Sequence, residues 1–199
     1  MRSGLRSHRD IASWDRETQV CVVGFGAAGA SAAIDARREG ADVIVFERAS
    51  GGGGTSAMSG GVLYLGGGTA LQTACGFEDS VEDMYRYLMA SVGDEPDEAK
   101  ISRYCEGSVA HFEWVKEQGV PYKETYYPGI SGEPPTDDGL VYSGAETTSP
   151  FCDIARPAPR GHVGIQPHQN CALLMKRRGC AAERSGADID ADQRVSKRV

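Results

Sequence analysis

The segment TQVCVVGFGAAGASAAIDARREGADVIVFE, residues 18–47, constrains the fold more than any other part of the chain. Residues 18–26 form an apolar run typical of a strand that is buried on both faces of a parallel sheet. The alanine-rich stretch 27–40 predicts a helix that ends at Gly40. Residues 41–47 predict a second buried strand. Strand, helix and strand in this order make a right-handed parallel βαβ unit, so the sequence predicts an α/β fold.

Three glycines stand in the turn between the first strand and the helix. Gly24, Gly26 and Gly29 match the spacing G-x-G-x-x-G, which gains meaning from its place between a strand and a helix. Gly24 allows the tight turn, Gly26 lets a pyrophosphate approach the backbone, and Gly29 lets the helix pack close to the strand. The N–H groups of the first helical turn would then bind the phosphates, helped by the helix dipole.

An acidic residue ends the second strand. Glu47 follows Gly29 by eighteen residues, and a carboxylate at this position accepts hydrogen bonds from the ribose diol of a dinucleotide. It would also repel a ribose 2′-phosphate, which disfavours NADP, although Arg48 beside it is a counter-argument. In the alternative interpretation the glycines serve packing alone and Glu47 is a solvated strand end. We favour a dinucleotide because strand, spacing and acid agree.

A second glycine-rich loop follows directly, since half of residues 51–68 are glycine. A flexible Gly/Ser linker is one interpretation, but apolar side chains are interleaved with these glycines. Ordering a glycine costs about 0.5–1 kcal/mol more than ordering an alanine, so an ordered loop needs a compensating interaction. A nicotinamide dinucleotide has no evident use for this loop. A flavin dinucleotide has one, because the loop can run under the pyrophosphate and along the isoalloxazine, with contacts from Thr55, Ser56 and Ser59.

Composition excludes several classes of function. The net charge of −7 argues against nucleic acid as a partner, and no apolar run approaches the ~20 residues of a membrane span. Residues 1–17 lack the apolar core of a secretory signal, and we expect a disordered tail there and a cytoplasmic protein. The six cysteines form no C-x-x-C pair, which predicts buried or half-buried free thiols. The four histidines show no ligand spacing with them, so we expect no metal site.

The remainder of the chain predicts helices and a long irregular segment. Residues 80–93, with Ser80 as N-cap, and residues 96–119 have helical spacing of apolar side chains. Residues 120–168 are rich in proline and glycine without a sustained period, which predicts irregular chain. Residues 171–186 predict a further helix, and residues 187–199 the start of a third strand or a hairpin.

The motifs VVGFGAAG, FERASGGGGTSAMSGG and GFEDSVEDMYRYLMAS resemble the FAD-dependent oxidoreductases of the fumarate reductase/succinate dehydrogenase flavoprotein superfamily. Residues 104–124 and 137–162 are similar to its 3-ketosteroid dehydrogenase branch in particular. The resemblance covers roughly residues 14–199. It implies a Rossmann-type FAD-binding unit with helical insertions over residues 18–199.

The resemblance also implies a set of cofactor-binding residues at the matching positions. Those expected to hold the pyrophosphate are Gly24, Gly26, Ala28 and Gly29. The adenosine ribose would meet Glu47, with Arg48 beside it. The residues expected to line the pyrophosphate and the flavin are Gly54, Thr55, Ser56, Ser59, Gly60 and Gly61. The backbone of Val195 would meet the adenine.

The chain departs from the family in length. Such flavoproteins are typically more than twice as long, and their cap domain and a final flavin-covering segment are absent here. An incomplete unit would leave a sheet edge and one sheet face uncovered. The resemblance implies dehydrogenation or reduction of a carbon–carbon bond next to a ketone in a steroid-like small molecule. The alternatives are a truncated, inactive FAD-binding remnant and an NAD-dependent dehydrogenase.

No residue of this chain is assigned a catalytic role. The tyrosines that would be able to donate a proton to a ketone are Tyr122, Tyr126, Tyr127 and Tyr142, although a loop tyrosine is more often a packing group. Arg160 and His162 either bind a carbonyl or carboxylate or brace a loop. The adjacent Asp137 and Asp138 indicate a turn rather than a catalytic pair, and residues 176–178 indicate a solvated helix face.

Overall fold

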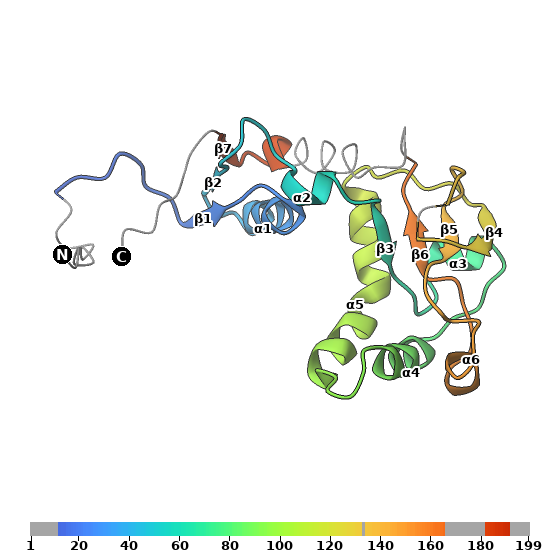
Figure 1. Cartoon of the computed structure of the whole chain (residues 1–199). Coiled ribbons are helices and arrows are strands. Elements are labelled where there is room, and N and C mark those ends of the chain that lie inside the picture. Colours follow the sequence, from blue (N-terminus) through green and yellow to red (C-terminus); the bar gives the residue numbers. More distant parts are fainter. Residues whose placement is uncertain (1–11, 133, 166–181, 192–199) are drawn as a thin grey trace. The chain divides into compact units, whose positions relative to one another are not determined.

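The computed structural model describes residues 12–132, 134–165 and 182–191 (Figure 1). Its contacts divide the chain into two compact units. Unit 1 contains residues 1–58 and 175–199, and unit 2 contains residues 59–174. Most of the expected tail, most of the expected helix over residues 171–186, and Val195 lie outside the described residues, so these expectations stay predictions.

Unit 1 is a three-stranded parallel sheet with the strand order β1-β2-β7. Its strands are β1 (Val20–Val23), β2 (Val43–Phe46) and β7 (Asp188–Asp190), and its helices are α1 (Ala27–Arg38) and α2 (Gly54–Ala57). The predicted strand–helix–strand order is therefore confirmed. α1 buries Ala30, Ala33 and Ile34, a stripe at the spacing of one helix face. Arg37 and Arg38 lie in its last turn, where cations interact favourably with the helix dipole.

The two faces of this sheet differ in burial. Val45 of β2 is fully buried, whereas Val23 of β1 is 63% exposed and Cys21 is exposed as well. Cys21 pairs with Ile44 and Val23 with Phe46, so these four side chains share one face. The prediction that the first strand is buried on both faces is therefore wrong. Ile44 on the same face is only 6% exposed, so this face is covered in part.

Unit 2 contains a four-stranded sheet with the order β3-β6-β5-β4. Its strands are β3 (Val62–Tyr64), β4 (Tyr126–Ile130), β5 (Leu140–Tyr142) and β6 (Gly161–Val163). β6 pairs antiparallel with both β3 and β5, and β4 pairs parallel with β5. The prediction of irregular chain over residues 120–168 is wrong at β4, β5 and β6. They are short, and Pro128 sits in β4, an edge strand, which is where a sheet tolerates proline.

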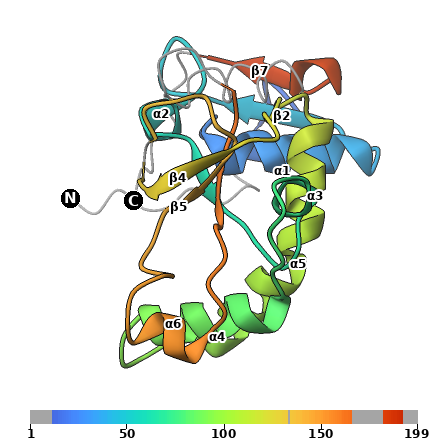
Figure 2. The ribbon, with the colours of Figure 1, turned by 90° about the vertical axis from the view of Figure 1, so that its right-hand side faces the viewer.

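The described part of unit 2 also contains four helices. They are α3 (Ala70–Ala74), α4 (Val81–Ser91), α5 (Glu98–Glu117) and α6 (Phe151–Ile154). The Ser80 hydroxyl accepts a hydrogen bond from the Asp83 N–H at 3.0 Å, which confirms the predicted N-cap of α4. α4 packs against both α5 and α6 (Figure 2). None of the helices in the described part of the chain is long and apolar enough to cross a membrane.

Candidate cofactor-binding site

The turn between β1 and α1 has a backbone that only glycine fits. Gly24 has a φ of +97°, in the left-handed region where a side chain is strained. Its N–H donates to the Phe46 oxygen at 2.8 Å. A Cβ on Gly29 would overlap the carbonyl oxygen of Gly24 and lie 3.2 Å from a methyl carbon of Val22. Because Gly24 and Gly29 carry no side chain, the turn, the first strand and the start of α1 pack closely together.

The second glycine-rich loop lies directly against this turn. The Gly53 N–H donates to the Phe25 oxygen at 2.7 Å, and a Cβ on Gly52 would overlap the Phe25 ring. The Ser56 hydroxyl accepts a hydrogen bond from the Ala27 N–H at 3.2 Å. Residues 52–56 therefore form an ordered contact with the leading end of α1, and a free linker is excluded for them.

This arrangement fits a pyrophosphate. The N–H groups of the first turn of a helix have no partner within the helix, and the positive end of the helix dipole lies there. A Cβ on Gly26 would lie 3.4 Å from Ser56 Oγ and 3.8 Å from the Gly53 oxygen, so a side chain would fill the space between the two loops. Ala28, in the same turn, is exposed.

Glu47 joins the two loops through its carboxylate. One oxygen accepts from the Phe25 N–H at 2.7 Å and the other from the Ala49 N–H at 2.8 Å. These hydrogen bonds, that of Ala49 first, lower the pKa of Glu47 below its ordinary value, so the group is ionised at neutral pH. It stands at the carboxyl end of β2, where a ribose would meet it.

The acidity of Glu47 predicts a pH-dependent contribution to stability. Because folding lowers its pKa from about 4.3, the carboxylate stabilises the fold fully above that pH, and the contribution disappears as the pH falls through the folded-state value. We expect Glu47→Gln to be less stable than the wild type at neutral pH and the difference to shrink at about pH 3. Urea unfolding of both proteins at the two pH values measures this. An unchanged difference would contradict it.

The other predicted cofactor residues are divided between the two units. Arg48, Gly54 and Thr55 are exposed on unit 1. Ser59, Gly60 and Gly61 begin unit 2, where Gly61 has a φ of +75°. Nothing in the described residues tests their contact with a cofactor.

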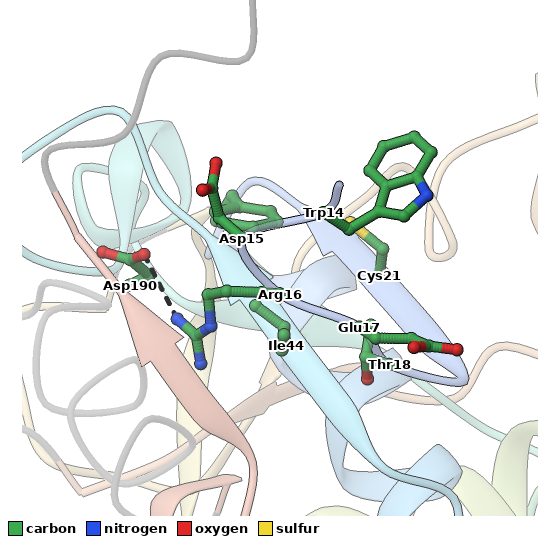
Figure 3. Close-up of a pocket in the computed structure, with 9 residues that line it drawn as sticks. Trp14, Asp15, Arg16, Glu17, Thr18, Cys21, Ile44 and Asp190 are labelled. Atoms are coloured by element: carbon green, nitrogen blue, oxygen red, sulfur yellow. Dashed lines mark hydrogen bonds and ion pairs between the residues drawn. The ribbon is translucent and has the colours of Figure 1, made fainter. Parts of the chain in front are cut away.

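A pocket of about 620 Å³ lies elsewhere on unit 1. Its lining contains Cys21, Ile44 and Phe46 of the sheet together with residues 14–18. Figure 3 shows Cys21 and Ile44 beside residues 14–18. Arg16 crosses to β7 and pairs with Asp188 and with Asp190, the latter at 3.3 Å. None of the predicted cofactor residues that the structure describes lines this pocket. The pocket lies on the sheet face that contains Cys21, Ile44 and Phe46.

Three of the four tyrosines considered as proton donors, Tyr122, Tyr126 and Tyr142, pack against other aromatic rings. Tyr126 and Tyr142 meet the Phe77 ring at 4.7 and 6.3 Å between centroids, and Tyr122 meets Phe112 at 5.0 Å. Burial raises the pKa of both Tyr126 and Tyr142.

Arg160 and His162 brace a loop of unit 2. Arg160 forms a fully buried ion pair with Asp79 at 2.7 Å. One ring nitrogen of His162 lies 2.7 Å from Thr69 Oγ1 and the other 3.0 Å from the Arg160 oxygen. Burial lowers the pKa of His162 to about 4, so the ring is neutral. Neither side chain is available to a substrate carboxylate.

The sequence analysis did not identify the residues that Arg160 and His162 contact. Asp79 also accepts from the Gly67 N–H and from Gln72 Nε2 at 2.9 and 3.0 Å. Ser108 Oγ accepts from the Gly66 N–H at 2.8 Å. Thr69 and Gln72 form a capping box on α3, and the pattern T-x-x-Q was the one available signal for this part of the network.

The remaining predictions concern turns, thiols and metals. Asp137 pairs with Lys123 at 2.7 Å, whereas Asp138 accepts from Thr136; no turn is assigned at the two aspartates. The described cysteines are free thiols, but Cys21 is exposed rather than buried. Among the described residues no cluster of metal-binding side chains is found.

Comparison with known proteins identifies the family. The profile of a family described as FAD binding domain matches residues 19–182. The chain belongs to this FAD-binding family. Membership confirms FAD as the predicted cofactor.

Individual relatives of this FAD-binding chain include steroid dehydrogenases and reductases. It is 35% identical over 196 residues to a 3-oxo-5-alpha-steroid 4-dehydrogenase of Comamonas testosteroni, covering 96% of this chain and 36% of that one. It is 35% identical over 158 residues to an acrylate reductase flavoprotein subunit of Shewanella woodyi, with coverages of 78% and 30%.

A solved structure is similar over nearly the whole chain. The 3-ketosteroid-Δ4-(5α)-dehydrogenase of Rhodococcus jostii RHA1, in complex with 4-androstene-3,17-dione, superposes with a TM-score of 0.92 at 49% identity. The match covers 96% of this chain and 41% of that one. The chain therefore spans about two-fifths, or less, of the relatives it matches, in agreement with the shortness noted in the sequence.

Proposed function

We propose that the chain is the FAD-holding part of an oxidoreductase that adds or removes hydrogen across a carbon–carbon bond next to a ketone. A small 3-ketosteroid-like molecule is the proposed substrate. The observation that carries the proposal is the direct contact of the two glycine-rich loops at the leading end of α1, through Ser56 and Ala27. The similarity to steroid dehydrogenases supports the substrate class.

The residues of unit 1 have distinct roles in this proposal. The first turn of α1 and Gly26 bind the pyrophosphate through backbone N–H groups, while Gly24, whose N–H donates to the Phe46 oxygen, shapes the turn. Glu47 accepts hydrogen bonds from the adenosine ribose while holding the two loops together. FAD, when bound, supplies the hydride acceptor or donor, and the protein supplies position and electrostatics.

A second candidate function is a remnant that binds FAD without turnover. The partial coverage of the longer relatives favours keeping this candidate. The family match favours a flavin over the NAD alternative. A cytoplasmic location stays a prediction.

FAD binding is tested by titration of the purified chain. We expect a yellow complex, and we expect Glu47→Ala to weaken binding by about 1–3 kcal/mol, the usual effect of losing a charged hydrogen-bond partner. Quenching of flavin fluorescence measures the affinity. Glu39→Ala is the matched control, because Glu39 is exposed at the opposite end of α1. Equal affinity of the wild type and Glu47→Ala would remove Glu47 from the site.

Catalysis is tested separately from binding. A 3-ketosteroid and an artificial electron acceptor are added to the FAD complex, and turnover is followed by product analysis. Loss of the yellow flavin colour on anaerobic addition of the steroid is the second readout. A yellow protein that shows neither turnover nor bleaching would support the remnant and contradict the enzyme.

A further inference from the structure

Unit 2 encloses a cation with one unpaired hydrogen-bond donor. The side chains of Arg160 and Asp79 are both 0% exposed. Asp79 accepts from two nitrogens of Arg160, Nε at 3.0 Å and Nη2 at 2.7 Å. The third nitrogen, Nη1, finds no acceptor among the residues that the structure describes. A buried charged donor without a partner is costly, so this nitrogen indicates a further group.

Two more buried polar atoms nearby also lack a hydrogen-bond partner among the described residues. Glu146 is 1% exposed, and its Oε2 accepts from the Gly144 N–H at 2.9 Å. Its Oε1 and the buried hydroxyl of Tyr64 have no hydrogen-bond partner within the described part of the chain. The three atoms comprise a donor, an acceptor and a hydroxyl that can act as either.

Tyr87 brings the three atoms into one neighbourhood. Its ring stacks on Tyr64 at 6.0 Å between centroids, and the guanidinium carbon of Arg160 lies 5.6 Å from the same ring. The Tyr87 hydroxyl accepts from the N–H of Ala145 at 3.0 Å, the residue next to Glu146. The charges of Glu146 and Arg160 both act on the Tyr64 phenol, which is close enough to Arg160 for a direct side-chain interaction. The phenol oxygen and Arg160 Nη1 nevertheless lack good hydrogen-bond geometry to each other.

We propose that Arg160 Nη1, the Tyr64 hydroxyl and Glu146 Oε1 together bind a single buried water molecule. Water can accept from Arg160 and Tyr64 and donate to Glu146. A bound anion would be repelled by the Glu146 carboxylate, and a metal cation by the guanidinium. Buried waters typically make about three hydrogen bonds to otherwise unpaired groups. Gly144 lets the chain approach Tyr87 and Glu146 closely, because a Cβ there would overlap the Tyr87 hydroxyl and lie 3.2 Å from the Glu146 carboxyl carbon.

The water would tie together segments that are distant in sequence. Tyr64 ends β3, Arg160 precedes β6, and Glu146 lies between β5 and α6. None of these three residues is assigned to FAD. The water site and the proposed function therefore stand or fall independently.

The sign of one substitution tests the proposal. Tyr64→Phe removes a water ligand, and we expect the unfolding equilibrium constant of the full chain to rise about fivefold. If the site is dry, the same substitution removes an unpaired buried hydroxyl and leaves stability unchanged or higher, which would overturn the proposal. Tyr85→Phe is the matched control, because its exposed hydroxyl donates to Glu98 at 3.0 Å. We expect it to be nearly neutral.

A double variant and a crystal structure test whether the three groups share one water. The effects of Tyr64→Phe and Glu146→Gln should not add, because both act on the same molecule. Additive effects would contradict a shared site. Density for a water within hydrogen-bond distance of all three atoms is expected. A direct bond from Tyr64 to Glu146 with no water between Arg160 and them would overturn the proposal.

Discussion

Replacing Gly29 with alanine is expected to destabilise unit 1 strongly and to weaken FAD binding. The new Cβ would overlap the carbonyl oxygen of Gly24 and crowd Val22. Both contacts are rigid, because one is backbone and the other is a buried strand side chain. Overpacking a site of this kind costs about 1–3 kcal/mol or more. Relieving it moves α1 away from β1, and the phosphate-binding turn lies between them.

The measurement is urea unfolding together with FAD titration of the variant. A matched control exists in α5, where Gly107 is also a helical glycine but a Cβ on it would meet no atom within 4 Å. We expect Gly107→Ala to stabilise the protein by about 0.5–1 kcal/mol, since alanine is the better helix former. A Gly29→Ala protein with normal stability and FAD affinity would contradict the close packing of turn and helix.

The part of the fold that was predicted correctly depends on local patterns. β1, α1 and β2 follow from the change between apolar runs and an alanine-rich helix within residues 18–47. α4 begins at the predicted N-cap Ser80 because a hydroxyl that satisfies the first turn is a local signal. The one error in this part concerns Val23, whose exposure depends on which other elements cover the sheet.

The second sheet was missed because its pairing is not local. β3 pairs with β6 about a hundred residues later in the chain, with Val62 opposite Val163. Strands of three residues show too little alternation to be found from periodicity. Gly161 lies in β6, where a Cβ would lie 2.8 Å from side-chain atoms of Val141 and Ser143, so its glycine serves strand packing rather than a turn.

In the candidate site, too, local motifs were predicted from the sequence and contacts between distant segments were not. Gly24, Gly26, Gly29 and Glu47 follow from a short motif whose spacing is set by the turn itself. The contact of Ser56 with Ala27 joins two loops, and the sequence indicated only that they had a common ligand. The roles of Arg160 and His162 depend on Asp79 and Thr69, and nothing in PRGH identifies these partners.

Replacing Asp79 with alanine is expected to destabilise unit 2 by about 3–5 kcal/mol, the usual cost of leaving one member of a buried ion pair unpaired. The carboxylate accepts from two nitrogens of Arg160, from Gln72 and from the Gly67 N–H. All these donors lose the carboxylate, Gln72 Nε2 keeps only the Pro159 oxygen, and the guanidinium stays fully buried. The loss is a large part of a net stability of about 5–15 kcal/mol. Urea unfolding measures it.

An exposed ion pair on the same unit provides the control for Asp79→Ala. Glu82 pairs with Arg86 at 2.8 Å, and both side chains are more than half exposed. Glu82→Ala should cost at most about 0.5 kcal/mol. The double variant Asp79→Leu with Arg160→Met removes both charges, so we expect it to be more stable than Asp79→Ala alone. A double variant no more stable than Asp79→Ala would show that lost packing, rather than the unpaired cation, dominates. Equal small losses in Asp79→Ala and Glu82→Ala would contradict the burial of the pair.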